Sequence, residues 1–398
     1  MQKKYSRILE RGVSQVLPDA ESLAKKMETG TIKVYLGIDA TGSLLHIGHA
    51  VVLRKLQQFV EAGQKVILLV GNATAKIGDP TGRDSTRPEL TDEQIKANFE
   101  NWQAQAAKIL DFDKIEIRHN GDWLDKLNFQ DLIKLLATTT VQQLMERDMF
   151  QERLKKGLPI FGHEIIYPLM QGYDSVAMDV DLEIGGSDQT FNMLMGRNLQ
   201  KAYHDKEKWI LTTPIINGLD GRKMSKSYGN FIALTAPARE MYAKLMSATD
   251  ENIFPYLEVL SDLPEEEIEK LKERMAAGEN PLTAKKIMAE AITGQYYSTE
   301  EVEAAADFFR KTVQEKQLPD EIPTVISPKA KGTVLELTRL CQPEKSSGEL
   351  KRLIAQGGVE DMTKKETLVE IDREINLEQK GEFILRVGKR NFYRVKFE

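Results

Sequence analysis

The chain has 398 residues with a formal net charge of −6, 41% hydrophobic residues and a single cysteine, Cys341. This length predicts two or three domains with sizeable cores, and the net negative charge argues against a protein that simply coats nucleic acid. One cysteine excludes a disulfide framework and suits a reducing cytoplasm, and no apolar run is typical of a signal peptide or a membrane span. We therefore expect a cytoplasmic protein that does not enter a membrane.

Residues 34–39 alternate as a β-strand with one apolar face. The opposite face is a poor core face, because it carries Tyr35, Gly37 and Asp39.

A helix is predicted over residues 47–62, with His46 and His49 at its start and Gly48 beside them. A helix start presents unpaired backbone N–H groups and positive potential, which favour phosphate. Glycine at that point lets a flat ring lie on the backbone. Two histidines could instead bind zinc, although the chain offers no nearby cysteine pair.

Strand and helix patterns alternate from residue 34 to residue 212. Further strands are expected at 65–71, 115–117, 180–184 and 209–211. Further helices are expected at 91–110, 129–155, 163–177 and 188–203. The alternation predicts a doubly wound parallel sheet, a Rossmann-like domain over residues 1–232, with an insertion at about 120–165.

Sheets of this kind bind ligands at the carboxyl ends of their strands. Asp39, Gly71, Gly186 and Asp188 follow predicted strand ends and should converge on one crevice. Residues 72–88 form a long loop after the second strand, and a loop of this length in a compact domain is usually functional.

The helix expected at 163–177 carries Tyr167, Gln171 and Asp174 on one face, at i, i+4 and i+7. On an isolated helix such a stripe would be solvated surface. Its place between the early histidines and a later lysine-bearing loop favours a ligand-binding role.

Residues 218–230 hold Lys223 and Lys226 three apart, with hydroxyl residues around them and glycines on both sides. This composition predicts a mobile loop rather than a helix or a central strand. Two ammonium groups and two hydroxyls suit phosphate oxygens, whereas a solvated surface turn is the plainer alternative.

From about residue 233 only helical patterns remain. They cover 239–248, 253–260, 265–276, 282–293 and 299–315. A helical domain is expected at 233–320 and a linker at 321–332. Residues 333–398 are expected to form a small domain with two short helices and a β-hairpin that turns at 388–391.

The sequence His-Ile-Gly-His at 46–49 and the sequence Lys-Met-Ser-Lys-Ser at 223–227, about 175 residues apart, resemble the paired signatures of class I aminoacyl-tRNA synthetases. Residues 77–83 and 182–189 extend the resemblance to the bacterial tyrosyl-tRNA synthetase family over nearly the full chain. The Met-Ser-Lys-Ser form matches one bacterial subgroup and differs from the Phe-Gly-Lys-Thr form that is common in the family.

This resemblance implies an enzyme that activates L-tyrosine with ATP and magnesium and then charges tRNA(Tyr). The implied catalytic residues are Thr41, His46, His49, Lys223 and Lys226. The implied ATP-binding residues are Gly37, Asp39, Gly48, Gly186, Asp188 and Lys226. No metal ligand from the protein is assigned, since magnesium would bridge phosphate oxygens.

The same resemblance assigns the amino-acid pocket. It implies that Tyr35 and Asp174 bind the phenol hydroxyl, and that the ammonium group is held by Asp79, Tyr167 and Gln171. Gln189 would lie near the carboxylate. Leu36 stands where many members have cysteine, so that contact to the ribose is absent here.

The C-terminal segment resembles the small RNA-binding module first known from ribosomal protein S four, on residues 346–354 and 357–359. Residues 331–398 hold 14 basic and 12 acidic side chains, so a stabilising cap is the alternative. The resemblance also implies an anticodon-side role for 233–320 and a homodimer to which the 120–165 insertion contributes.

Two other interpretations stay open, a tryptophanyl-tRNA synthetase and an inactive, synthetase-derived RNA-binding protein. Tryptophan would not need Tyr35 and Asp174 together, because indole has no hydroxyl. Intact histidines and lysines in both signatures argue against an inactive protein.

Overall fold

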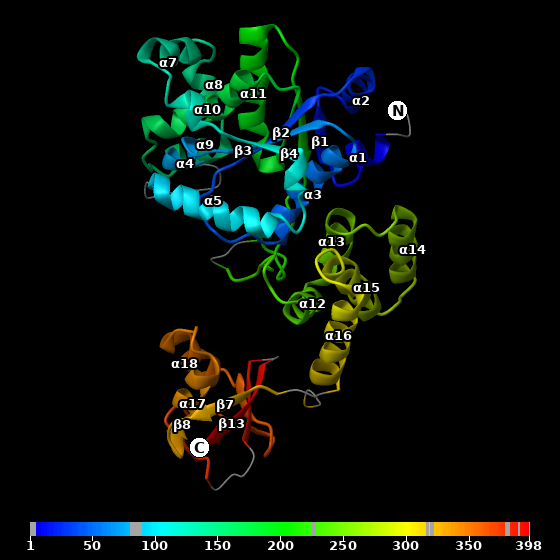
Figure 1. Ribbon diagram of the computed structural model, residues 1–398, viewed down its shortest axis with the longest axis vertical. Helices are drawn as coiled ribbons and strands as arrows, with labels where there is room; N and C mark the ends of the chain where they lie inside the picture. Colours follow the sequence, from blue (N-terminus) through cyan, green and yellow to red (C-terminus); the bar gives the residue numbers. More distant parts are fainter. Residues whose placement is uncertain are drawn as a thin grey trace. The chain divides into compact units, whose positions relative to one another are not determined.

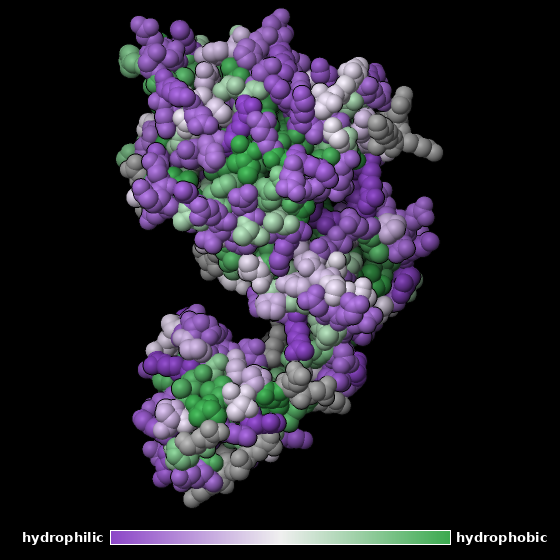
Figure 2. Space-filling model, in the orientation of Figure 1, coloured by the Kyte–Doolittle hydropathy of each residue, from purple (hydrophilic) through white to green (hydrophobic). Residues whose placement is uncertain are grey.

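The computed structural model describes residues 5–79, 90–224, 228–315, 318, 322–378, 383–388 and 391–397. The chain divides into two compact units, one up to Ser298 and one from Thr299 onward, and Figure 1 labels most of their helices and some of their strands. No helix among the described residues is long and apolar enough to cross a membrane. Hydrophilic residues predominate on the face of the molecule drawn in Figure 2.

The first unit is built on a six-stranded sheet with strand order β1-β6-β5-β2-β3-β4. Its strands are β1 (Gln15–Leu17), β2 (Lys33–Ile38), β3 (Lys65–Val70), β4 (Ile115–His119), β5 (Leu182–Gly186) and β6 (Trp209–Thr213). Strands β2 to β6 pair in parallel, which confirms the predicted doubly wound sheet. The antiparallel edge strand β1 was not predicted, because three residues are too few to show alternation.

Helices cover this sheet. They are α1 (Ser6–Glu10), α2 (Ala20–Thr29), α3 (Ile47–Glu61), α4 (Thr74–Ile77), α5 (Asp92–Ala106), α6 (Gly121–Leu124), α7 (Phe129–Leu136), α8 (Val141–Met145), α9 (Asp148–Lys155), α10 (Gly162–Met178) and α11 (Thr190–His204). Helix α3 packs against β3 and β5, and α10 packs against α11. Thr91 begins α5 with a reciprocal capping box. Asn128 and Thr140 begin α7 and α8 in the same way, and these two helix starts explain why the pattern predicted at 129–155 is divided into separate helices.

The predicted helices after residue 233 are α12 (Ala238–Met246), α13 (Ile253–Leu260), α14 (Glu265–Ala276) and α15 (Pro281–Thr293). They belong to the same compact unit as the sheet, so the boundary expected at 232/233 does not separate compact units. Two backbone hydrogen bonds of 3.0 Å fasten this junction to the start of α3, from Ile47 N–H to the Ile232 carbonyl and from Leu234 N–H to the Leu45 carbonyl.

The second unit begins with α16 (Thr299–Phe309) and a π-helical turn, Arg310–Gln314, which the sequence placed in the helical domain. Part of the expected linker at 321–332 instead forms β-strands. Strand β7 (Thr324–Ser327) pairs in parallel with β13 (Asn391–Phe397), and β8 (Lys331–Thr333) pairs with β11 (Glu374–Asn376). Such short strands give no periodic signal among the prolines that surround them.

The rest of this unit packs two helices against a five-stranded sheet of order β10-β9-β12-β13-β7. The remaining elements are α17 (Val334–Cys341), α18 (Ser347–Ala355), β9 (Val359–Asp361), β10 (Glu366–Thr367) and β12 (Phe383–Val387). Their core includes Leu337, Ile354, Phe383 and Val395. The antiparallel pairing of β12 with β13 confirms the predicted hairpin.

Candidate active site

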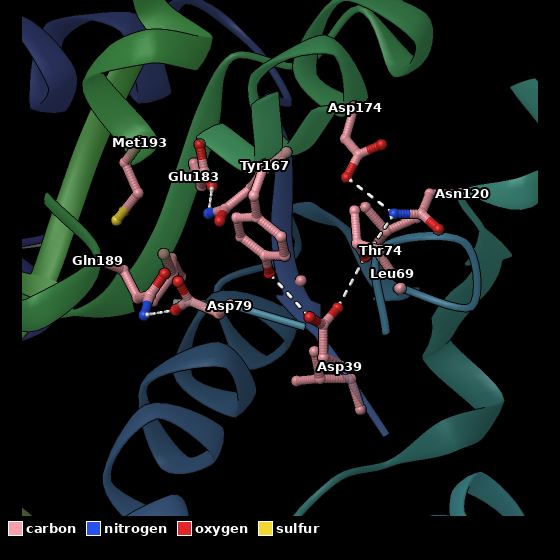
Figure 3. A pocket seen from close by; sticks show the side chains of 16 residues that line it. Asp39, Leu69, Thr74, Asp79, Asn120, Tyr167, Asp174, Glu183, Gln189 and Met193 are labelled. Atoms are coloured by element: carbon pink, nitrogen blue, oxygen red, sulfur yellow. Dashed lines mark hydrogen bonds between the residues drawn. The ribbon is translucent and has the colours of Figure 1, made fainter. Parts of the chain in front are cut away.

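A cavity of about 200 Å³ opens at the carboxyl ends of β2, β3 and β5 (Figure 3). The residues predicted from the sequence that line it are Gly37, Asp39, Gly71, Asp79, Tyr167, Gln171, Asp174 and Gln189. The strand ends and the polar face of α10 therefore meet in one place, as the sequence predicts.

Asp39, directly after β2, is held between two hydroxyl groups. Thr74 Oγ1 donates to Asp39 Oδ1 at 2.7 Å and the Tyr167 hydroxyl donates to Oδ2 at 2.8 Å, as Figure 3 shows. Desolvation raises the pKa of Asp39 to about 6, and the two hydrogen bonds oppose that rise. Asp39 therefore changes charge near pH 6, and its hydrogen bond fixes the Tyr167 ring.

Asp174 lies in the cavity wall and is 2% exposed. Trp123 Nε1 donates to its Oδ1 at 2.8 Å, and Asn120 Nδ2 donates to its Oδ2 at 3.2 Å. Burial raises the pKa of Asp174 well above its usual range, and these two donors oppose the rise. Asn120 and Trp123 were not predicted as site residues, because the strand that begins at Ile115 was expected to end at 117. The strand ends at His119, so Asn120 occupies another strand-end position.

The Asp79 carboxylate interacts with an amide and with a guanidinium group. Gln189 Nε2 donates to Asp79 Oδ2 at 2.7 Å, and Arg147 Nη2 lies 3.6 Å from Oδ1. Gln189 belongs to the 3-10 turn that follows β5, whereas Arg147 precedes α9 in the expected insertion. The insertion thus contributes a buried cation beside the cavity, which sequence reasoning did not identify.

Tyr35 and Asp174 are not brought to the same cavity surface. Tyr35 is fully buried behind the lining residues, and its hydroxyl lies 2.9 Å from Ser175 Oγ. That both residues bind one phenol stays a prediction. An alternating strand does turn Tyr35 toward α10, but the sequence could not show that Ser175 would take its hydroxyl.

The two histidines of the early motif form the cap of α3. The Nδ1 atom of His46 accepts from Gly48 N–H, and the Nδ1 atom of His49 accepts from His46 N–H, both at 3.2 Å. A neutral imidazole that accepts at Nδ1 carries its proton on Nε2, so both rings can donate from that side.

The late motif lies against the early one. A Cβ atom added at Gly48 would lie 3.0 Å from the His46 ring and 3.2 Å from the Met224 sulfur. A side chain at this position would require the His46 ring or the Met224 side chain to shift by a few tenths of an ångström, so glycine favours the contact between the two motifs.

A second cavity of about 220 Å³ shares Ile38 and Asp39 with the first and is also lined by Thr41 and His49. The two cavities therefore adjoin at Asp39. This arrangement offers two neighbouring chambers, one with buried carboxylates and one beside the histidine motif.

Lys223 approaches the end of β5. Desolvation raises the pKa of Asp188, and the positive charge of Lys223 opposes that rise. The neighbouring Gly186 ends β5. Asn230 Nδ2 donates to Asp220 at 2.7 Å across the base of the lysine loop. The predicted residue Lys226, in the run 225–227, lies outside the described residues.

Comparison with known proteins decides the family. Residues 27–314 match a family model described as class I tRNA synthetases for W and Y. The chain belongs to the class I tRNA synthetases. A relative, the tyrosine–tRNA ligase of Thermotoga maritima, is 44% identical over 98% of this chain and 96% of its own length. The tyrosine–tRNA ligase of Carboxydothermus hydrogenoformans is 42% identical over 100% of this chain and 98% of its own length.

The fold agrees with solved structures. A C-terminally truncated mitochondrial tyrosyl-tRNA synthetase of Aspergillus nidulans superposes with a TM-score of 0.64 at 22% identity, over 78% of this chain and 94% of that one. In this class I synthetase the matched residues 27–314 contain both cavities and both motifs.

Proposed function

We propose that this synthetase is a tyrosine–tRNA ligase. It activates L-tyrosine with ATP and then transfers the tyrosyl group to the 3′ end of tRNA(Tyr). The observation that carries the proposal is the nearly full-length similarity to tyrosine–tRNA ligases, joined to a polar cavity with a buried carboxylate at Asp174.

In the first step a carboxylate oxygen of tyrosine attacks the α-phosphorus of ATP. The bond from that phosphorus to the bridging oxygen breaks, pyrophosphate leaves and tyrosyl-adenylate remains. No nucleophile from the protein is required, so alignment and charge neutralisation supply the rate enhancement.

In the amino-acid pocket Asp174 accepts the phenol proton, because each of its oxygens accepts one hydrogen bond and keeps a lone pair for a second. The Tyr35 hydroxyl donates to the phenol oxygen, as the family resemblance implies. Asp79, Tyr167 and Gln171 receive the ammonium group, and Gln189 lies near the carboxylate. Asp174 and these four residues line the first cavity, which supports their assignment to one small ligand.

On the nucleotide side, Gly37, Asp39, Gly48, Gly186 and Asp188 bind adenosine. Thr41, His46 and His49 donate to phosphate oxygens, and Lys223 and Lys226 neutralise the leaving pyrophosphate. Magnesium would be bound mainly by phosphate oxygens and water, as is usual for this ion at nucleotides. Within the described residues, no three His, Cys, Asp or Glu side chains are gathered as metal ligands.

The active form is a homodimer that uses the inserted segment. Large apolar side chains there are solvent-exposed, namely Phe129 at 76%, Ile133 at 50%, Val141 at 67%, Leu154 at 53% and Phe161 at 47%. Such exposure on one segment is typical of a protein interface. Residues 233–320 then serve the anticodon side, and residues 333–398 bind RNA.

The test is ATP–pyrophosphate exchange measured with each amino acid in turn. We expect exchange with tyrosine and none with phenylalanine or tryptophan. Exchange that depends on tryptophan would assign the other branch of the family, and the absence of exchange with every amino acid would indicate an inactive relative.

A further inference from the structure

Glu183 and Lys208 form a buried ion pair at the back of the cavity. Glu183 on β5 is 2% exposed and Lys208, just before β6, is 0% exposed. The Lys208 ammonium group donates to Glu183 Oε2, to Ser175 Oγ at 2.8 Å and to the Met193 carbonyl at 3.2 Å. These bonds use all three donors of the ammonium group.

The fold makes room for this pair. A Cβ atom added at Gly196 would lie 2.5 Å from Lys208 Nζ and 3.4 Å from Glu183 Oε2. Burial of two charges is seldom more stable than apolar side chains of similar volume. Stability alone therefore gives no reason for a charged pair at this place.

The second oxygen of Glu183 reaches the substrate cavity. Gln171 Nε2 donates to Glu183 Oε1 at 3.2 Å, and both residues line the cavity (Figure 3). An ionised carboxylate only accepts hydrogen bonds, so Gln171 must turn its NH₂ group toward Glu183. Its amide oxygen then points away from Glu183, and within the described part of the chain that oxygen accepts no hydrogen bond.

We propose that Glu183, held by Lys208, is a positioning residue that fixes the Gln171 amide with its oxygen toward the substrate ammonium group. The pair thereby selects ligands with a protonated α-amino group. This inference rests on the proposed function and deepens it, since it explains how one member of the ammonium-binding set acquires its polarity.

The experiment replaces the pair by uncharged side chains of similar volume, Glu183→Met/Lys208→Met, so that no buried charge is left unpaired. Equilibrium binding to the full-length protein is measured for L-tyrosine, for tyrosinol, which keeps the ammonium group, and for the deamino analogue of tyrosine, which lacks it. We expect tyrosine and tyrosinol to bind about tenfold more weakly, which corresponds to one hydrogen bond to a charged group. Binding of the deamino analogue should not change.

A second variant, Glu183→Gln, tests the polarity itself. Lys208 requires an acceptor, so the amide introduced at this position turns its oxygen to Lys208 and its NH₂ group to Gln171, which must then reverse its own amide. The selective loss for tyrosine and tyrosinol should be at least as large as in the double variant. In exchange assays KM for tyrosine should rise while kcat changes little.

The matched control is Arg153→Met/Glu164→Met, which removes another buried ion pair, with side-chain exposures of 2% and 4%. Its glutamate lies on α10, the helix that carries Gln171. Neither residue lines the cavity, so the ratio of tyrosinol to deamino-analogue affinity should stay at the wild-type value. Equal weakening of the binding of all three ligands in the Glu183 variants, or no weakening, would overturn this inference and leave the proposed function unaffected. A wild-type protein that binds neither tyrosine nor tyrosinol would overturn the proposed function as well.

Discussion

The two sides of the candidate site hold their polar groups in different ways. On the cavity side Asp174, Glu183 and Lys208 are almost fully buried, and protein partners surround them. On the motif side His46 is half-buried and Lys223 is exposed. A buried and fully satisfied network is rigid and selective, whereas cations near the surface can meet a highly charged ligand without a large desolvation cost. The comparison supports the proposal that the cavity provides selectivity and that the two motifs neutralise charge.

The largest effect should come from the motif side. Lys226→Ala should lower the rate of adenylate formation by roughly 3 kcal/mol of transition-state stabilisation, because charge builds on the leaving pyrophosphate. Tyrosine affinity should barely change. Single-turnover kinetics and equilibrium dialysis measure the two quantities, with Lys201→Ala on α11 as a control for the loss of an exposed lysine. A normal rate in Lys226→Ala would remove this lysine from the mechanism.

On the cavity side, Asp174→Ala should lower the preference for tyrosine over phenylalanine by about 2 kcal/mol, since it deletes a charged acceptor. It also leaves the donors of Asn120 and Trp123 without their carboxylate, so the free energy of unfolding should fall. Exchange assays with both amino acids measure the preference. An unchanged ratio would show that the phenol binds elsewhere.

Asp39 lies where the two sides meet, and it should make stability depend on pH. Its folded-state pKa of about 6 exceeds the ordinary value of 3.8, so the native state binds more protons between these pH values. The free energy of unfolding therefore falls as pH rises from about 4 to about 6 and then levels off.

Asp39→Asn lacks this term. As pH rises from about 4 to about 6, the free energy of unfolding of the variant should increase by roughly 2 kcal/mol relative to that of wild type. Above about pH 7 the difference between the two proteins should stay constant. Urea titrations at several pH values check this. Parallel curves for the two proteins would show that Asp39 does not titrate there.

The smallest effect should come from Tyr35→Phe. Because its hydroxyl is bonded to Ser175, we expect a loss of about 1 kcal/mol in the free energy of unfolding. Discrimination against phenylalanine should also fall by about 1–2 kcal/mol, since the family resemblance implies that Tyr35 contacts the phenol. Unchanged discrimination would show that the Tyr35 hydroxyl supports Ser175 and does not contact the phenol. Denaturant titration and exchange with both amino acids separate the two outcomes.

The sequence by itself determined features that depend on neighbours along the chain. The continuous apolar run of β3 predicted a buried parallel strand, Thr91 marked the start of α5, and the i, i+4, i+7 spacing placed Tyr167, Gln171 and Asp174 on one face of α10. These follow from local periodicity and capping, which a single element already expresses. Strand ends predicted the cavity because parallel strands share one carboxyl edge.

Only the tertiary structure decided which polar groups meet. Periodicity predicted the face of β2 on which Tyr35 lies, but only the structure shows that its hydroxyl lies 2.9 Å from Ser175 Oγ on α10. Arg147, in the insertion, lies beside Asp79. Lys208 contacts Glu183 at a place where Gly196 has no side chain to obstruct it. Such pairs depend on the register between distant segments, and a buried charge finds its partner only when every neighbouring element is in place.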